Sequence, residues 1–409
     1  MGGMIRALPL IARRTILAGP AASLLNARAA QEQVDEVLRS GIARRVIPTA
    51  VGSIAGRRKT LYVGAFGVRD ASGAPARANS IFRIASMTKP VTTVAALQLV
   101  DQGKVGLSEP VAKHLPQLAT LEVLEGFDGA GKPILRPART PITLHHLLTQ
   151  TSGLCYQVWD ERMFRYSSAK VENAPAKPGP LMFEPGTRWQ YGQGTAWAAR
   201  LVEAMTGATL EDYFQERILR PLGMQDTTYI FPEAKFDRLV ASYQRDSGGE
   251  IKPNERRLPS RPAGFNGDGG LYSTAADYVR FMQMILNRGA GPGAVRILKP
   301  QTVESMLRNQ IGDLSAGKMR SFQPGTSADV DFQPGHAQKW GYGFLINTTP
   351  YVGGRSAGSG AWGGINNTFF WIDPKRDRCG VLLMQYLPFV DKEAVGLLDD
   401  FEKAAYRFL

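Results

Sequence analysis

The sequence predicts an α+β fold in which both ends of the chain contribute strands to one antiparallel sheet around a mostly helical insert. Apolar and small residues alternate from about residue 49 to 70, as in a β-hairpin. From about residue 105 to 257, helical patterns are separated by loops rich in proline and glycine. After Lys339 the strand patterns return, and the chain of 409 residues closes on a helix. A chain of this length can bury a sizeable core in two packed layers.

These patterns divide the chain into three parts. Residues 31–85 and 258–409 are expected to form one α/β subdomain that holds the antiparallel sheet. Residues 86–257 are expected to form a mostly helical subdomain, with the active site between the two. Residues 1–30 are expected to be an export signal or an N-terminal extension.

The first thirty residues contain features of a leader. The pair Arg13-Arg14 precedes a short apolar stretch, and the triplet ending at Ala29 could be a cleavage site, which together resemble a twin-arginine export signal. Because Pro20 interrupts the stretch, a retained N-terminal helix is the alternative. The sequence therefore leaves both a periplasmic and a cytoplasmic location open.

Local signals justify the individual elements. Residues 31–47 carry apolar residues at helical spacing, and the basic segment GRRKT at 56–60 predicts the turn of the hairpin rather than a phosphate-binding patch. The helix that follows residue 90 is expected to end at Gly103. In the segment GDGGLYSTAADYVRF, Ser273 is the expected N-cap of an amphipathic helix.

Composition and charge narrow the class of protein. Hydrophobic residues make up 44% of the chain and charged residues 21%, which is typical of a globular enzyme. The net charge of +13 is dispersed along the sequence, whereas a nucleic-acid-binding protein concentrates its excess charge on one element. No run reaches the roughly 18 apolar residues of a membrane-spanning helix, so no membrane span is expected. A mildly cationic surface that favours anionic substrates remains an alternative.

Cysteine and histidine give little support for a metal or a disulfide. The two cysteines, Cys155 and Cys379, lie in unrelated segments and imply no disulfide framework. Cys155 is either a thiol nucleophile or, as we favour, a buried inert thiol. The four histidines lack the spacing of a zinc site, so no metal is expected.

The segment FRIASMTKPVTT places Ser86 three residues before Lys89, where an apolar run gives way to a helical one. A serine hydroxyl needs a neighbouring base, and a residue three positions along a helix lies on the same face. Pro90 is compatible with the first turn of such a helix, whose N-terminal N–H groups could face an oxyanion. Lysine acts as a base only where its surroundings lower its pKa, which the sequence does not show. The alternative is an N-cap serine with a surface lysine.

The S-x-x-K pattern alone decides nothing, because it recurs at Ser167/Lys170 and at Ser315/Lys318 in loop-like segments. Two other segments add to it. Tyr191 follows a Pro-Gly turn and precedes a helix. The triplet Trp362-Gly363-Gly364 begins a strand whose glycines allow another backbone to approach closely.

Together, the Ser/Lys pair, the tyrosine segment and the strand triplet resemble the three-part motif of the penicillin-recognising serine hydrolases. From about residue 31 to the C-terminus the chain looks most like the family VIII carboxylesterases, which share the class C β-lactamase fold. The resemblance implies a β-lactamase-like fold and an acyl-enzyme on Ser86. It also implies that Lys89 and Tyr191 form the proton-transfer pair, and that the backbone N–H groups of Ser86 and Ile365 hold the oxyanion.

Two departures from the motif concern the substrate. The position two residues after the tyrosine, Ser or Asn in β-lactamases, is Gln193, which could still donate to an acyl group on a longer arm. The triplet begins with Trp362 instead of a lysine, which favours a neutral ester over a β-lactam carboxylate. With Gly363 and Gly364, Trp362 is expected to line the mouth of the substrate site. Taken singly, Tyr191 and Trp362 could also be ordinary buried aromatic residues.

The sequence thus predicts a serine carboxylesterase that cleaves small, short-chain esters and needs no metal or organic cofactor. The alternatives are a β-lactamase, a D-amino-acid amidase or an acyltransferase on the same scaffold, or a binding protein without catalysis. The segment GRSAG around Ser356 fits the nucleophile elbow of α/β-hydrolases, but that fold requires a histidine after the serine. All four histidines precede Ser356, so we reject it as the nucleophile.

Overall fold

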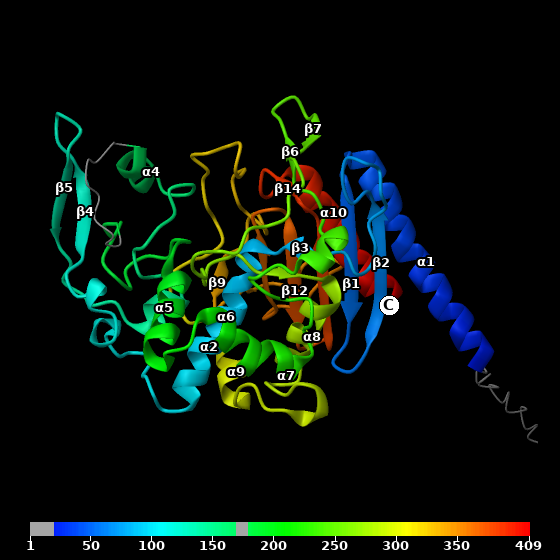
Figure 1. The fold of residues 1–409 in the computed structure, drawn as a ribbon, viewed down its shortest axis with the longest axis horizontal. Helices are drawn as coiled ribbons and strands as arrows, with labels where there is room; N and C mark the ends of the chain where they lie inside the picture. The colour runs from blue at the N-terminus through cyan, green and yellow to red at the C-terminus, as the bar shows by residue number, and fades with distance from the viewer. Residues whose placement is uncertain (1–19, 169–178) are drawn as a thin grey trace, which may run out of the picture.

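The computed structural model describes residues 20–168 and 179–409 (Figure 1). Its centre is an antiparallel seven-stranded sheet in the order β2-β1-β13-β12-β11-β10-β9. The predicted fold class is therefore confirmed. The strands of this sheet are β1 (Thr49–Ala55), β2 (Thr60–Gly67), β9 (Gln338–Trp340), β10 (Leu345–Asn347), β11 (Gly360–Gly364), β12 (Thr368–Asp373) and β13 (Arg378–Leu383).

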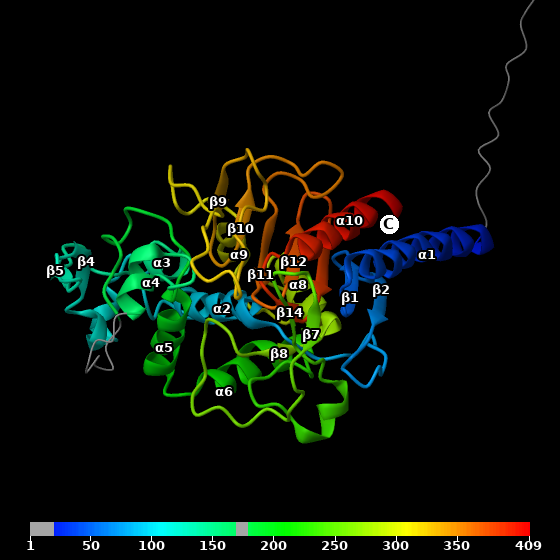
Figure 2. The same cartoon turned by 90° about the horizontal axis from the view of Figure 1, so that it is seen from above.

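Helices cover both faces of this sheet. The N-terminal helix α1 (Pro20–Arg45) lies beside the C-terminal helix α10 (Lys392–Phe408) on one face, as Figures 1 and 2 show. Helix α8 (Ala275–Leu286) packs on the other face, against β13, β1 and β12. Successive residues of β12 point to opposite faces, so Phe370 contacts Tyr278 of α8 while Trp371 contacts Phe401 of α10.

The rest of the chain contains helices and short strands joined by loops, and it extends away from α1 (Figure 1). A 3-10 turn, η1 (Ala85–Met87), leads directly into the buried helix α2, which packs on α5. The helices of this part are α2 (Thr88–Asp101), α3 (Leu144–Leu148), α4 (Glu161–Ser168), α5 (Gly194–Thr206), α6 (Leu210–Phe214), α7 (Arg220–Leu222) and α9 (Pro300–Met306). The short strands are β3 (Phe82–Arg83), β4 (Glu122–Phe127), β5 (Pro133–Pro137), β6 (Tyr243–Arg245), β7 (Ile251–Pro253), β8 (Tyr272–Ser273) and β14 (Tyr386–Leu387).

Several local predictions can be compared with these elements. The basic segment at 56–60 does form the turn between β1 and β2. The prediction that Ser273 caps α8 is wrong, because Ser273 ends β8 and the Thr274 hydroxyl accepts the Asp277 N–H instead. Within the described residues, no helix has the length and apolar character needed to cross a bilayer. Most of the leader-like segment lies outside the described residues.

Candidate active site

Ser86 lies in the middle of η1, on a turn held by its neighbours. Ala85 has a φ of 45°, which is rare for a residue with a side chain and is found where surrounding contacts fix the backbone. The Met87 carbonyl accepts a hydrogen bond from Tyr278 at 3.0 Å, and the Ile84 carbonyl accepts one from Thr368 at 3.4 Å. These contacts anchor the turn to α8 and β12, while Ser86 itself stays half-buried.

Lys89 lies one turn further along, in the first turn of α2. Its Nζ atom is 3.4 Å from Ser86 Oγ, and the side chain is 1% exposed. Nζ also donates to the Tyr156 hydroxyl at 3.0 Å and to the Asp268 carbonyl oxygen at 2.9 Å. The structure therefore brings the predicted serine and lysine together and buries the amine.

The other two S-x-x-K pairs have different surroundings. Ser315 and Lys318 are exposed in a loop, and Lys318 forms an ion pair with Asp331. Ser167 is exposed near the end of α4, and Lys170 lies outside the described residues. Burial thus distinguishes the pair at residues 86 and 89 from the exposed pair in the loop.

Two tyrosines flank Lys89. Residues 154–156 run antiparallel to residues 191–193, with a bridge between Cys155 and Gly192, so that Tyr156 and Tyr191 lie side by side. Lys89 Nζ lies 5.1 Å from the centroid of the Tyr156 ring and 4.8 Å from that of Tyr191. The sequence predicted Tyr191 as the partner of Lys89, yet the hydroxyl that bonds to Lys89 belongs to Tyr156. Sequence reasoning missed Tyr156, although it directly follows the motif-like segment TSGLC.

The Tyr191 hydroxyl points instead to Trp362. The indole Nε1–H donates to the Tyr191 oxygen at 3.0 Å. Because an indole N–H can only donate, this oxygen is the acceptor and its own proton is free for another partner. Trp362 is 3% exposed and packs against Trp340 and Phe332, and its place at the mouth of the site remains a prediction.

The glycines of the strand triplet let β11 approach the turn that carries Ser86. A Cβ atom at Gly364 would lie 2.3 Å from the Ile84 carbonyl oxygen, and one at Gly363 would lie 2.7 Å from the Phe369 ring. A side chain at Gly364 would require the backbone to shift, and one at Gly363 would require the Phe369 ring to move. Ile365, half-buried, follows in the turn between β11 and β12. The segments that carry both predicted oxyanion donors, Ser86 and Ile365, are therefore adjacent.

Gln193 lies two residues after Tyr191, and among the described residues only its backbone forms a hydrogen bond. It is the N-cap residue of α5, and its backbone N–H donates to the Leu154 carbonyl at 2.8 Å. In the described part of the chain its half-buried side chain forms no hydrogen bond. Gly192 is required here, because a Cβ atom would lie 1.8 Å from the Leu154 oxygen. A role of Gln193 toward the substrate remains a prediction.

The structure adds an acidic residue that sequence reasoning missed. Asp268 is 6% exposed, and its Oδ2 atom accepts the Tyr156 hydroxyl at 2.6 Å. Its Oδ1 atom lies 3.5 Å from Lys89 Nζ. Burial, followed by the charge of Asp268, raises the pKa of the Tyr156 phenol well above its usual range, so Tyr156 donates as a neutral phenol. The signal in the sequence is one acid among the glycines of GDGG.

The two rejected nucleophiles have surroundings that do not activate them. Cys155 is 2% exposed, and burial raises the pKa of its thiol well above the usual range. Ser356 lies in the loop between β10 and β11, where its backbone N–H bonds to Asp373 at 2.8 Å. Within residues 20–168 and 179–409, no three histidine, cysteine or acidic side chains are grouped as metal ligands.

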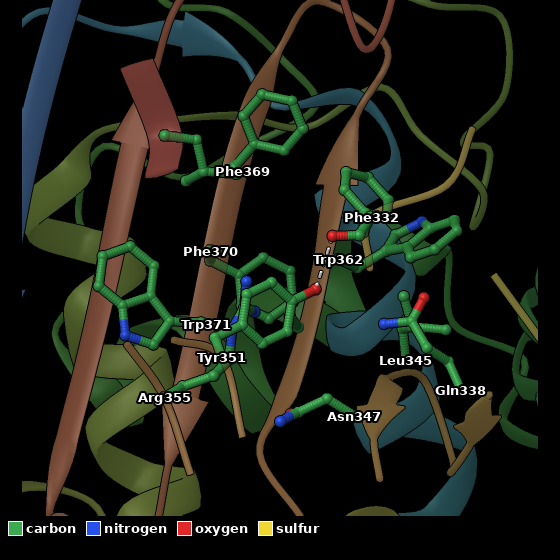
Figure 3. Close-up of a pocket in the computed structure, with 12 residues that line it drawn as sticks. Phe332, Gln338, Leu345, Asn347, Tyr351, Arg355, Trp362, Phe369, Phe370 and Trp371 are labelled. Carbon is green, nitrogen blue, oxygen red and sulfur yellow. Dashed lines mark hydrogen bonds between the residues drawn. The ribbon is translucent and has the colours of Figure 1, made fainter. Parts of the chain in front are cut away.

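Figure 3 shows a separate cavity on the α10 side of the sheet. Phe369, Trp371 and Leu398 line it, and the Tyr351 hydroxyl donates across it to the Phe332 carbonyl at 3.1 Å. It has room for about one water molecule. Trp362 lines it, whereas Ser86 and Lys89 do not, so the cavity does not hold the candidate nucleophile and base.

The fold and the buried Ser86–Lys89 pair define a serine hydrolase of the β-lactamase-like superfamily. Residues 34–403 match the family described as Beta-lactamase, and the chain belongs to that family.

Relatives within this family act on esters or transfer acyl groups. The chain is 32% identical to the lovastatin esterase of Penicillium rubens over 351 residues, 81% of this chain and 86% of that protein. It is 30% identical to the monacolin J acid methylbutanoyltransferase of Aspergillus terreus over 416 aligned positions, 94% of this chain and 98% of that protein.

Solved structures agree with this assignment. Unliganded simvastatin synthase from Aspergillus terreus superposes with a TM-score of 0.79 at 29% identity, covering 92% of this chain and 98% of that one. EstCE1, a hydrolase with promiscuous acyltransferase activity, superposes with a TM-score of 0.70. The superposition covers 93% of this chain and 100% of the EstCE1 chain. At 22% identity it supports the fold alone.

Proposed function

We propose that this protein is a serine carboxylesterase that cleaves small carboxylic esters through an acyl-enzyme on Ser86. The observation that carries the proposal is the buried amine of Lys89, 3.4 Å from Ser86 Oγ at the start of α2. An amine at this distance can take the serine proton as Oγ attacks the ester carbonyl. We also propose that, within its family, this protein is similar in function to the family VIII carboxylesterases.

In the proposed reaction, Ser86 Oγ attacks the carbonyl carbon and its proton passes to Lys89. The N–H groups of Ser86 and Ile365 stabilise the negative oxygen of the tetrahedral intermediate, an effect typically of about 10²–10³ in rate for each donor. Tyr191, whose ring lies against Lys89, relays the proton to the leaving alcohol. The Trp362 N–H stabilises the negative charge that develops on the Tyr191 oxygen as the proton leaves. Water then attacks the acyl-enzyme by the reverse route.

The absence of a cation at residue 362 favours a neutral substrate. The position that holds lysine in penicillin-recognising enzymes is a buried indole here. A β-lactam carboxylate would find no charge at this position to offset its loss of water. Short-chain esters should therefore be hydrolysed faster than β-lactams by orders of magnitude.

Acyl transfer to an alcohol other than water is the second candidate. It is supported by the alignment of 94% of this chain with a protein named as a methylbutanoyltransferase. Both reactions share the acyl-enzyme and differ in the acceptor. Product analysis with p-nitrophenyl butyrate and a secondary alcohol separates them, because a transferase forms the new ester while an esterase releases butyrate.

The test of the proposal is Ser86→Ala, assayed with p-nitrophenyl butyrate. We expect kcat/KM to fall at least about 10³-fold, because no other nucleophile replaces Oγ. Ser315→Ala, in the exposed S-x-x-K segment, is the matched control and should keep full activity. Undiminished turnover by Ser86→Ala refutes the proposal. A nitrocefin rate equal to the ester rate refutes its substrate class, and failure of a fluorophosphonate to label Ser86 favours a binding protein.

A further inference from the structure

The carboxylate of Asp268 is buried beside the catalytic lysine, and the reaction described above gives it no role. Oδ2 is held by the Tyr156 hydroxyl at 2.6 Å, while the backbone carbonyl of the same residue accepts from Lys89 at 2.9 Å. Oδ1 lies 3.5 Å from Lys89 Nζ and, in the described part of the chain, has no hydrogen-bond partner. A buried oxygen without a partner is unfavourable, so a carboxylate in this place needs a physical reason.

The groups that face Asp268 come from several elements. Lys89 of α2 is the cation, and Tyr156 lies on the opposite side with Tyr191 behind it. Tyr229 donates to the Asn266 carbonyl at 2.8 Å, and the Glu211 carboxylate accepts the Tyr229 backbone N–H at 2.9 Å. The carboxylate thus has phenols and one amine around it, with a second acid, Glu211, beyond Tyr229.

A carboxylate so close to an amine changes what the amine can do. The ammonium of such an ion pair has no lone pair and cannot accept the serine proton. Lys89 can then act only if it gives up one proton as it receives another. Within its contacts, Asp268 is the group that can take that proton, because Tyr156 already donates its own to Oδ2.

We propose that Asp268 is a positioning residue that takes a proton from Lys89 as Lys89 takes the proton of Ser86, so that the base of this site is the Lys89–Asp268 pair. The inference rests on the proposed function and names the base of that same reaction. Before attack the groups are the serine hydroxyl, the ammonium and the carboxylate. After attack they are the serine ester oxygen of the tetrahedral intermediate, the ammonium and the carboxylic acid. When the alcohol leaves, it receives a proton of Lys89 through Tyr191, and Asp268 returns its proton to Lys89.

Tyr156 has a defined part in this arrangement. Its hydroxyl fixes Oδ2, which leaves Oδ1 directed at Lys89. Loss of this hydrogen bond would remove the contact that holds the carboxylate toward Lys89. Tyr156 therefore keeps the pair in position for proton transfer.

The experiment is the pH dependence of kcat/KM for Asp268→Asn with p-nitrophenyl butyrate. An amide cannot take the proton, so Lys89 must lose one to solvent before each turnover. We expect activity at pH 7 to fall roughly 10²-fold and to rise with pH, whereas the wild-type profile stays level over the same range. Asp268→Glu should recover the level profile in part, and the exposed control Asp313→Asn should keep it.

The pH dependence of kcat/KM for Tyr156→Phe is a second test, which does not depend on whether the Asp268 variant folds. We expect the pH profile of Tyr156→Phe to differ from that of the wild type, with a loss of about 3- to 10-fold at neutral pH. Tyr351→Phe, which removes a buried hydroxyl bonded to a backbone carbonyl, should leave the profile unchanged. A wild-type pH profile in both Asp268→Asn and Tyr156→Phe overturns the inference. If a fluorophosphonate still labels Ser86 and Ser86→Ala is still inactive, the protein remains an esterase in which Asp268 does not take the proton.

Discussion

At the scale of single residues, the surroundings of a side chain decide its role more than its type does. Trp362 occupies the position that is lysine in the motif of the penicillin-recognising enzymes, and the sequence suggested a stacking surface for the substrate. In the fold the indole is buried and donates its N–H to Tyr191 at 3.0 Å. Its contribution is therefore expected through Tyr191 rather than through contact with the acyl chain.

Trp362→Phe tests this reading. The change keeps an aromatic ring in the cluster with Trp340 but removes the N–H that reaches Tyr191. One net hydrogen bond of about 0.5–1.5 kcal/mol predicts a kcat roughly 2- to 10-fold lower. KM for p-nitrophenyl esters of different chain length should change little, because the indole is almost fully buried. A changed chain-length preference with an unchanged kcat would contradict this prediction.

At the scale of elements, short helices depend on their caps. Helix α3 is five residues long and leads into the segment that carries Tyr156. Thr143 and His146 form a reciprocal capping box, in which the His146 Nδ1 atom accepts the Thr143 N–H at 3.2 Å. Only the neutral imidazole can accept there, so the cap depends on the charge of His146.

The cap predicts a loss of stability in acid. Burial, followed by the nearby His145 ring, lowers the pKa of His146 to about 4. In the unfolded chain histidine titrates near about 6.5, so between these values the unfolded state binds more protons. The contribution of His146 is therefore complete above about pH 6.5 and is lost as the pH falls toward 4. Between about pH 7 and about pH 4.5, the free energy of unfolding measured with urea should fall less for His146→Gln than for the wild type. Glutamine can still complete the capping box, and it does not titrate.

The exposed His336 provides the control for this measurement. His336→Gln should retain the full acid sensitivity of the wild type. Equal acid sensitivity in wild type and His146→Gln would show that the cap does not depend on the charge of His146.

At the scale of the whole molecule, a buried ion pair joins the end of the chain to the sheet. Arg355, in the loop between β10 and β11, bonds to Glu402 of α10 at 2.9 Å, and both side chains are at most 6% exposed. The Arg355 guanidinium also stacks on Tyr351, 4.2 Å from the ring centroid. Because β11 carries the triplet beside Ser86, this pair stabilises the sheet on which the site is built.

Glu402→Gln should lower the apparent free energy of unfolding by about 3–5 kcal/mol, since it leaves the Arg355 charge buried without a partner. Urea unfolding measures the effect. The double variant Arg355→Met/Glu402→Leu should recover most of the loss, because it removes both charges. Asp399→Asn, in the exposed pair with Lys403, should change stability by less than about 1 kcal/mol. A small effect of Glu402→Gln would mean that water reaches the pair.

The sequence by itself determined the fold class and the segments that carry the candidate chemistry, because strand alternation, glycine triplets and the Ser86–Lys89 spacing are local patterns. It ranked Ser86 above the two other serines of the same motif through the helix that follows Ser86 and the order of distant segments. The cap of α8 shows the limit of local reading: Ser273 and Thr274 are equally good caps in sequence, and the pairing of β8 with β3 decides between them.

Only the tertiary structure decided which side chains surround Lys89. Tyr156 and Asp268 lie 67 and 179 positions from it along the chain, and no periodicity relates them to it. The burial of Trp362 likewise depends on residues of β9 and the loop before it. Local propensities act over a few residues, whereas the charge balance of a buried amine depends on every group that packs within a few ångströms of it, whatever its place in the sequence.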